Sequence, residues 1–223
     1  MKFKITLAIF TGLASIGSAA FGCPCSEITI PNPAPETSYE LGLNFTKTNK
    51  YKKEFASATN SAKKFCIDYK KEHPGETNLA IVSDIDETIL DNREQFRLHP
   101  ERDWALFDKW VNEAKAPVLK PTYEFLTWAR KNGFAIFFIT GRPESDRKPT
   151  ITNLVRDNIS YDALYLRPHH GGAPAEEYKT AVRQEIEKMG FKIVVNIGDQ
   201  FSDLAGGSSL DCEKLPNKMY FIK

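Results

Sequence analysis

Runs of apolar residues alternate along this chain with longer segments of helical periodicity, and that alternation limits what it can fold into. Two runs, at 134–140 and 192–198, are apolar at most positions, which is typical of parallel strands covered on both faces. Further strand candidates lie at 79–83, at 163–167 and, for an edge strand, at 218–222. Helical patterns cover residues 122–131, 145–157 and 175–189. The alternation predicts an α/β fold with a doubly wound parallel sheet.

A long helix is expected before the first strand, and two glycines mark the ends of later helices. Residues 49–71 place apolar side chains near helical spacing among many lysines, and the sequence HPGE at 73–76 ends the pattern. Gly133 and Gly190 follow helical segments, as C-cap glycines do.

Residues 93–118 contain no strand candidate but are rich in large aromatic side chains. Because this segment directly follows the first strand, we expect a small helical cap insertion over the carboxyl ends of the strands, the edge where open α/β sheets bind ligands. For Trp104 and Trp110 the expected role is packing inside this insertion.

The chain has 223 residues and a formal net charge of +1, which suits a single domain and argues against a partner that is a nucleic acid polymer or an anionic membrane. Residues 1–22 have the basic, apolar and small-residue regions of a signal peptide. Residues 23–48 are expected to form an extended leader, and residues 49–223 the folded domain. The chain is therefore predicted to be exported, to the periplasm, the outer membrane or the medium of a bacterium.

The cysteines also bear on export. An exported chain can form disulfides, and the four cysteines, Cys23, Cys25, Cys66 and Cys212, allow three pairings between which the sequence does not choose. Simple signal cleavage after Ala20 is expected, and cleavage just before Cys23 is an alternative that would make Cys23 a lipid anchor. No zinc-ligand spacing is present in the sequence.

Polar sequences follow three of the predicted strands. They are Asp84-Ile85-Asp86, Thr140-Gly141-Arg142 and the stretch 198–203. Carboxyl ends of parallel strands share one edge of a sheet, so these residues are expected to converge. Asp84, Asp86 and Asp199 offer the hard oxygen ligands that suit Mg²⁺, and a bound cation would keep Asp84 ionised as a nucleophile. Lys179 and the Thr140 hydroxyl would then hold a phosphoryl group, with Gly141 permitting close approach.

These four motifs, in this order, resemble those of the haloacid dehalogenase (HAD) superfamily of phosphatases. The sequence DIDETILDN of 84–92 with the insertion behind it is similar to exported acid phosphatases of the class B/class C type. The stretches YKTAVR, GDQFSDL and KLPNKMYFI resemble the related plant acid phosphatases and vegetative storage proteins. The likeness runs from about residue 50 to the C-terminus and implies a HAD-like Rossmannoid fold.

The resemblance also implies a role for each motif residue. Asp84 would be the nucleophile that forms an aspartyl-phosphate, and Asp86 the general acid and base. Mg²⁺ would be bound by the Asp84 carboxylate, the Asp86 backbone carbonyl and Asp199, with Asp203 as a further ligand or as an anchor behind the ligands. Thr140, Gly141 and Lys179 would bind the substrate phosphate.

Several neighbours of the motifs have less defined roles. Glu87 is expected to be structural, and Asp91 and Asn92 to cap the insertion. Arg142 and Arg183 suit either phosphate steering or salt bridges within the fold. The pair His169 and His170 is expected to lie in a solvated loop and not to catalyse.

The predicted function is that of a secreted, Mg²⁺-dependent acid phosphatase acting on small phosphate monoesters. Nucleoside monophosphates stacked on an aromatic residue of the insertion are the narrower alternative. Phosphoryl transfer to an acceptor alcohol would use the same intermediate. A non-catalytic storage or binding role is disfavoured because Asp84, the residue that the storage relatives have lost, is present.

Overall fold

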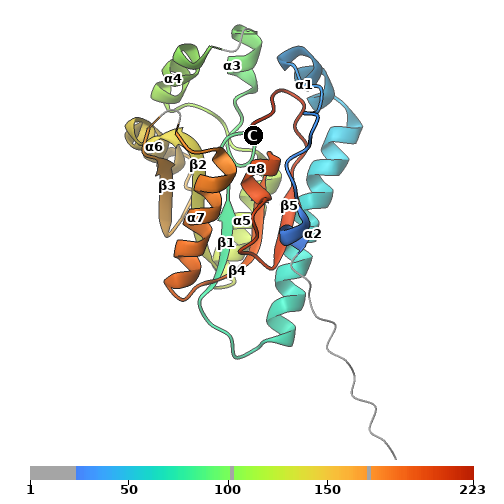
Figure 1. Ribbon diagram of the computed structural model, residues 1–223, viewed down its shortest axis with the longest axis vertical. Coiled ribbons are helices and arrows are strands. Elements are labelled where there is room, and N and C mark those ends of the chain that lie inside the picture. Colours follow the sequence, from blue (N-terminus) through green and yellow to red (C-terminus); the bar gives the residue numbers. More distant parts are fainter. Residues whose placement is uncertain (1–23, 101–102, 170–171) are drawn as a thin grey trace, which may run out of the picture.

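A computed structural model describes residues 24–100, 103–169 and 172–223 of the chain. Its strands are β1 (Leu79–Ser83), β2 (Ala135–Pro143), β3 (Ala163–Arg167), β4 (Lys192–Gly198) and β5 (Asp211–Lys214). They form one parallel sheet in the order β3–β2–β1–β4–β5 (Figure 1). The predicted doubly wound α/β fold is confirmed. The winding changes direction between β1 and β4, which makes their carboxyl ends the topological switch point.

Helices cover both faces of the sheet. One face carries α2 (Asn49–Glu72), α5 (Lys120–Lys131) and α6 (Arg147–Arg156), and the other carries α7 (Ala175–Lys188) with the short α8 (Phe201–Leu204) beside it. Successive residues of β1 alternate between the faces. Ile81 packs with the α2 side, whereas Ala80 and Val82 pack with Val182 and Ile186 of α7. Because both faces are covered, all five residues of β1 are buried.

The predicted helix boundaries hold closely. The Thr48 side chain accepts a hydrogen bond from the backbone N–H of Tyr51 at 3.1 Å and thereby caps α2. Gly133 and Gly190 follow α5 and α7 with φ values of +82° and +89°, the left-handed conformation that a C-cap glycine adopts without a steric penalty. Two 3₁₀ turns, η1 (Pro24–Glu27) and η2 (Glu144–Asp146), complete these elements.

The segment after β1 forms the predicted helical insertion. It contains α3 (Arg93–Leu98) and α4 (Trp104–Glu113), which lie at the upper end of the sheet in Figure 1, close to the C-terminus and to α1 (Tyr39–Thr46). The helix α1 corrects one prediction, because residues 23–48 were expected to form only an extended leader. Ser38 caps it by accepting a hydrogen bond from Leu41 N at 3.0 Å, and Gly42 packs so closely on Met219 that a Cβ would lie 2.5 Å from the Met219 backbone nitrogen.

The edge strand is also corrected. The run at 218–222 forms no strand, and the edge is instead β5, which pairs with β4 from Val195↔Asp211 to Gly198↔Lys214. The segment 218–222 is held by separate hydrogen bonds, among them Ile222 N to the Gln200 side chain at 3.0 Å. The segment is apolar but does not pair with a neighbouring strand. An apolar pattern alone does not distinguish such a segment from a buried strand.

One disulfide joins the N-terminal turn η1 to β5. Cys25 and Cys212 are bonded across 187 residues of sequence, with their Cα atoms 5.4 Å apart, and Cys66 is a buried free cysteine on α2. Cys23 and the predicted signal peptide lie outside the described residues. Among the helices described, none combines the length and apolar character needed to cross a membrane.

Candidate active site

The predicted site residues meet at the carboxyl ends of β1 and β4. Asp84 continues the ladder between these strands, since its backbone N–H donates to Ile197 O at 3.0 Å. A cavity of about 680 Å³ opens at this edge. Of the predicted residues, it is lined by Asp84, Asp86, Gly141, Lys179, Asp199 and Asp203. The chain thus brings four distant stretches of sequence to one place.

Lys179 joins two of the buried carboxylates. Its Nζ donates to Asp84 Oδ1 at 2.5 Å and to Asp203 Oδ1 at 2.6 Å, and all three side chains are at least 93 % buried. Burial lowers the pKa of Lys179, but the carboxylates of Asp203 and Asp84 outweigh it and the pKa is raised overall. Burial raises the pKa of Asp84, against the opposing charge of Lys179. The ammonium is therefore fixed as a cation beside the predicted nucleophile.

Three carboxylates form a group that suits a cation. Asp84, Asp199 and Asp203 each place one oxygen within 4.8 Å of the others. Oxygen-only donors are those that Mg²⁺ prefers in proteins, so the residues present fit the predicted ion. The Asp86 side chain is not in this group.

Asp199 is oriented by its neighbours. Its Oδ2 accepts hydrogen bonds from the side-chain amides of Gln200 and Asn217, each at 2.6 Å. In the part of the chain that the structure describes, Oδ1 accepts only one long hydrogen bond, of 3.4 Å, from the Thr88 hydroxyl. Burial, with the nearby charge of Asp203, raises the pKa of Asp199 to about 6. One oxygen is thus anchored and the other remains available to a cation.

The residue before Asp199 has to be glycine. A Cβ at Gly198 would lie 2.4 Å from Asp203 Oδ2, closer than any carbon and oxygen can approach without a bond. That oxygen accepts from the backbone N–H of Gln200 at 2.8 Å and closes a capping box at the start of α8. Gly198 therefore allows the Asp203 side chain to fold back over the end of β4 while its other oxygen holds Lys179.

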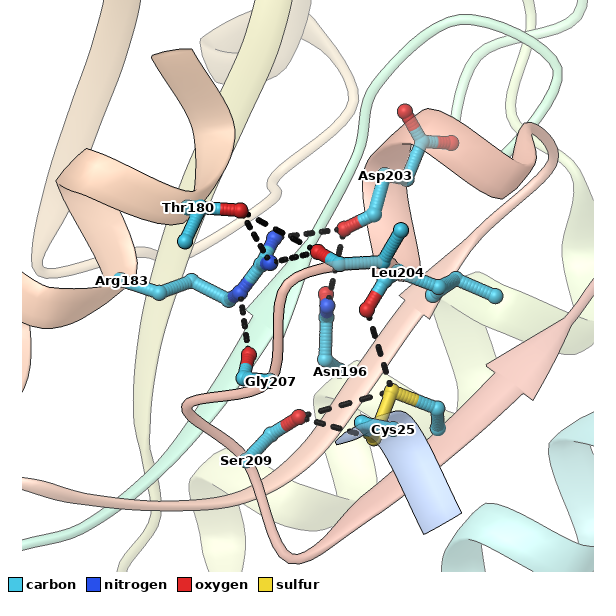
Figure 2. Close-up of a disulfide and its surroundings, with 10 residues drawn as sticks. Cys25, Thr180, Arg183, Asn196, Asp203, Leu204, Gly207 and Ser209 are labelled. Atoms are coloured by element: carbon cyan, nitrogen blue, oxygen red, sulfur yellow. Dashed lines mark hydrogen bonds between the residues drawn. A yellow bond between two sulfur atoms is a disulfide. The ribbon is translucent and has the colours of Figure 1, made fainter. Parts of the chain in front are cut away.

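Two further side chains donate hydrogen bonds to backbone carbonyls of α8 and of the loop that follows it (Figure 2). Arg183 donates to Asp203 O at 2.7 Å and to Gly207 O at 2.9 Å, and Asn196 donates to Asp203 O at 2.9 Å. The disulfide lies beside the same loop, where Ser209 Oγ approaches Cys25 Sγ at 3.0 Å. Of the two roles expected for Arg183, the structure supports the internal one, through carbonyl groups of the chain.

Asp86 is held by Arg142. The Arg142 Nη2 donates to Asp86 Oδ1 at 2.7 Å and its Nε to Oδ2 at 3.0 Å. Asn92 Nδ2 donates to Oδ1 as well, at 2.9 Å. Burial lowers the pKa of Arg142, but Asp86 outweighs it and the pKa is raised overall. Of the two expected roles for Arg142, the salt bridge within the fold is the one observed.

The second motif lies at the cavity wall. Gly141 lines the cavity, and a Cβ there would meet no atom within 4 Å, so its surroundings leave room for a ligand. Thr140 is fully buried behind it, and its Oγ1 accepts from Arg142 N at 3.2 Å. His169 is exposed and is not among the residues that line the cavity, as predicted for that loop; His170 lies outside the described residues.

Aromatic side chains form the outer wall of the cavity. It is lined by Tyr39, Phe96, Trp104, Phe107 and Tyr220. Phe96 stacks on Tyr39 with ring centroids 4.5 Å apart and meets Tyr220 edge-on at 5.7 Å. Trp104 is 55 % exposed, so the prediction that it packs in a core is wrong, whereas Trp110 is buried at 5 % and confirms it. Tyr39 and Tyr220 were missed, because they come from the leader and from the C-terminal segment.

Buried carboxylates and a lysine at the carboxyl ends of parallel strands suit an enzyme that acts on phosphate groups. Comparison with known families identifies the class. The family described as HAD superfamily, subfamily IIIB (Acid phosphatase), matches residues 29–223. The chain therefore belongs to subfamily IIIB of the HAD superfamily, the acid phosphatases. This confirms the predicted family, and with it the predicted class of enzyme, a phosphomonoesterase, at the level of the family.

Similar proteins occur in plants and bacteria. Acid phosphatase 1 of Solanum lycopersicum is 38% identical over 148 residues, which are 63% of this chain and 58% of that protein. Stem 28 kDa glycoprotein of Glycine max is 31% identical over 85% of this chain and 76% of its own length. The class C acid phosphatase from Bacillus anthracis has the same fold, with a TM-score of 0.69, 22% identity and coverage of 82% of this chain and 85% of that one. The match to the Solanum protein spans less than two thirds of that relative.

Proposed function

We propose that the chain hydrolyses small phosphate monoesters through an aspartyl-phosphate on Asp84. The observation that supports this most strongly is the buried arrangement of Asp84, Lys179 and Asp203, in which an acidic nucleophile faces a fixed ammonium at 2.5 Å. A lysine placed there can take up the charge of a phosphoryl oxygen when substrate enters. Family membership favours the same reaction.

Asp84 would attack phosphorus as the bond from phosphorus to the ester oxygen breaks. Asp86 would give its proton to the departing alcohol, so that the alcohol leaves neutral. In the second step Asp86 would take a proton from water as the water oxygen attacks the aspartyl-phosphate, which releases phosphate and restores the Asp84 carboxylate. Lys179 and the backbone at Gly141 would bind the phosphoryl oxygens, with the Thr140 hydroxyl behind them.

A divalent cation belongs to this proposal. Asp84, Asp199 and the Asp86 backbone carbonyl would hold Mg²⁺, with Asp203 as an anchor, because Asp203 is already engaged by Lys179 and Gln200. When bound, Mg²⁺ supplies positive charge that offsets the charge of the phosphate and of the carboxylates. The chain's own contribution is to hold the carboxylates together against their mutual repulsion.

The aromatic wall favours substrates with a flat leaving group. Trp104 presents an exposed ring beside Phe107, with their centroids 6.3 Å apart, and rings of this kind stack on aromatic groups. Aryl phosphates and nucleoside monophosphates are therefore proposed as preferred substrates. Export is also proposed, since the bond between Cys25 and Cys212 requires an oxidising compartment to persist.

Hydrolysis of a chromogenic aryl phosphate tests the proposal. We expect activity with Mg²⁺, loss of activity with a chelator, and recovery when Mg²⁺ is restored. Asp84→Asn should lose at least about a hundredfold in kcat, whereas Asp68→Asn, a change to an exposed aspartate on α2, should be neutral. Activity of Asp84→Asn near that of the wild type, or insensitivity to the chelator, would refute the proposal.

A further inference from the structure

Asn92 connects the helical insertion to the predicted acid and base. It is fully buried at the end of the loop that follows β1. Its Nδ2 donates to Asp86 Oδ1 at 2.9 Å, and its Oδ1 accepts from Trp110 Nε1 of α4 at 2.8 Å. A second contact of Nδ2 reaches Glu87 Oε2 at 3.4 Å. Each polar atom of the Asn92 side chain therefore has a partner.

The partners allow only one orientation of the Asn92 amide. The indole N–H of Trp110 is a donor only, and the carboxylates of Asp86 and Glu87 are acceptors when ionised. A flipped amide would point its NH₂ at the indole N–H and its oxygen at two carboxyl groups. The tryptophan of the insertion therefore sets which atom of Asn92 faces Asp86.

Glu87 holds the other side of Asn92. The Asn92 backbone N–H donates to Glu87 Oε1 at 2.8 Å, and Tyr220 OH donates to Glu87 Oε2 at 2.6 Å. Glu87 is itself buried, with its backbone in the left-handed region at φ 55°. The backbone and the side chain of Asn92 are thus both fixed, and its amide cannot follow a displaced Asp86.

We propose that Asn92, oriented by Trp110, is a positioning residue that holds Asp86 in the geometry needed to protonate the leaving alcohol. This inference rests on the proposed function and deepens it. Among the described residues, Asp86 Oδ1 accepts from Asn92 and twice from Arg142, whereas Oδ2 accepts only from Arg142 Nε. Oδ2 therefore has fewer hydrogen-bond donors than Oδ1 and is the oxygen assigned to proton transfer, while Asn92, held by Trp110 of the insertion, fixes the orientation of the carboxyl group through Oδ1.

The dependence of rate on the leaving group tests this role. A poor leaving group such as an alkyl alcohol needs its proton in the transition state, whereas a nitrophenol leaves readily without one. In Asn92→Ala we expect kcat/KM for an alkyl phosphate to fall by at least about tenfold, and kcat/KM for a nitrophenyl phosphate by less than about threefold. Trp110→Phe keeps the ring but removes the N–H, and should show a smaller change in the same direction.

Two matched variants separate positioning from general loss of structure. Asn153 is likewise a buried asparagine that bridges two segments, through Ala116, and Trp128 is a half-buried tryptophan on α5. Asn153→Ala and Trp128→Phe should leave the ratio of the two kcat/KM values unchanged. An unchanged ratio of the two kcat/KM values in Asn92→Ala, whether both activities fall equally or neither falls, would overturn the proposal.

A measurement without substrate separates this inference from the proposed function. The three tryptophans give three indole N–H resonances, and the one lost in Trp110→Phe identifies Trp110. Replacing Asp86 with Ala should shift the Trp110 resonance through Asn92 more than that of Trp104, although Trp104 lines the same cavity as Asp86. A Trp110 resonance unmoved by this change would overturn the coupling, whether or not the wild type hydrolyses phosphate esters.

Discussion

Replacing Lys179 with Met removes the only ammonium that the described residues place between Asp84 and Asp203. Both carboxylates are at least 93 % buried, and Nζ lies 2.5 Å and 2.6 Å from them. A methionine fills the space of the side chain but leaves two neighbouring buried carboxyl groups without a counter-charge. Breaking a buried ion pair by removing one partner costs about 3–5 kcal/mol of stability, and we expect a loss in this range for metal-free Lys179→Met at pH 7.

The loss should depend on pH in a defined direction. Burial already raises the pKa of Asp84 in the presence of Lys179, and removing the ammonium raises it further. In the unfolded chain the carboxyl group ionises near pH 4, so above that pH the native variant retains a proton that the unfolded chain has lost. Relative to the wild type, the stability of the variant then falls by about 1.4 kcal/mol per pH unit for each proton that the native variant retains and the native wild type has lost. Towards pH 4 the difference should narrow.

Urea unfolding followed by tryptophan fluorescence, at pH 5 and pH 7 with a chelator present, measures this difference. Lys188→Met, which alters an exposed lysine in the last turn of the same helix, should change stability by less than about 0.5 kcal/mol. The reasoning is refuted if Lys179→Met loses less than about 1 kcal/mol at pH 7 or loses the same amount at both pH values.

Three further predictions concern the metal, the disulfide and the cavity wall. Because the pKa of Asp199 is raised to about 6 and a ligand must be ionised, Mg²⁺ affinity should fall about tenfold per pH unit below pH 6; titration calorimetry showing a flat profile would contradict this. Replacing both Cys25 and Cys212 with Ala should lower the free energy of unfolding by about 2–5 kcal/mol, measured by urea unfolding, and a loss below about 1 kcal/mol would argue against a stabilising bond. Trp104→Ala should raise KM for aryl and nucleoside phosphates about three- to tenfold and leave that for glycerol phosphate unchanged; equal effects on both in steady-state assays would exclude stacking.

The sequence predicts the parts of the fold that local pattern determines. The strands at 79–83 and 192–198 have nearly all of their residues buried between helices. Strands covered on both faces of a parallel sheet are apolar, so these two are recognisable in the sequence. The edge strand β5 has the sequence DCEK and only half-buried residues, so it carries no strand pattern of its own. Its strand conformation depends on pairing with β4 and on the disulfide at Cys212, neither of which is a local property.

Some residues of the site could likewise be predicted from the sequence, and others could not. The convergence of Asp84 and Asp203 followed from the shared edge of parallel strands. Lys179 lies on a helix, α7, and its place beside them was expected from its charge and from the family resemblance. The hydrogen bonds of Asn92 to Asp86 and Trp110 could not be predicted, because they depend on how the insertion packs over the end of β1. Tyr39 and Tyr220 line the cavity from segments near the two ends of the described chain. No sequence pattern predicts that these two segments meet there.

The central claim is that Asp84 carries the phosphoryl group during turnover. The most direct measurement is acid quenching of wild-type protein during its reaction with a phosphate monoester, followed by mass spectrometry of the peptide that contains Asp84. The account predicts that this peptide gains the mass of one phosphoryl group, on Asp84, and that Asp84→Asn gains none. Turnover of the ester without any mass gain on the Asp84 peptide, or a phosphoryl group on another residue, would contradict it.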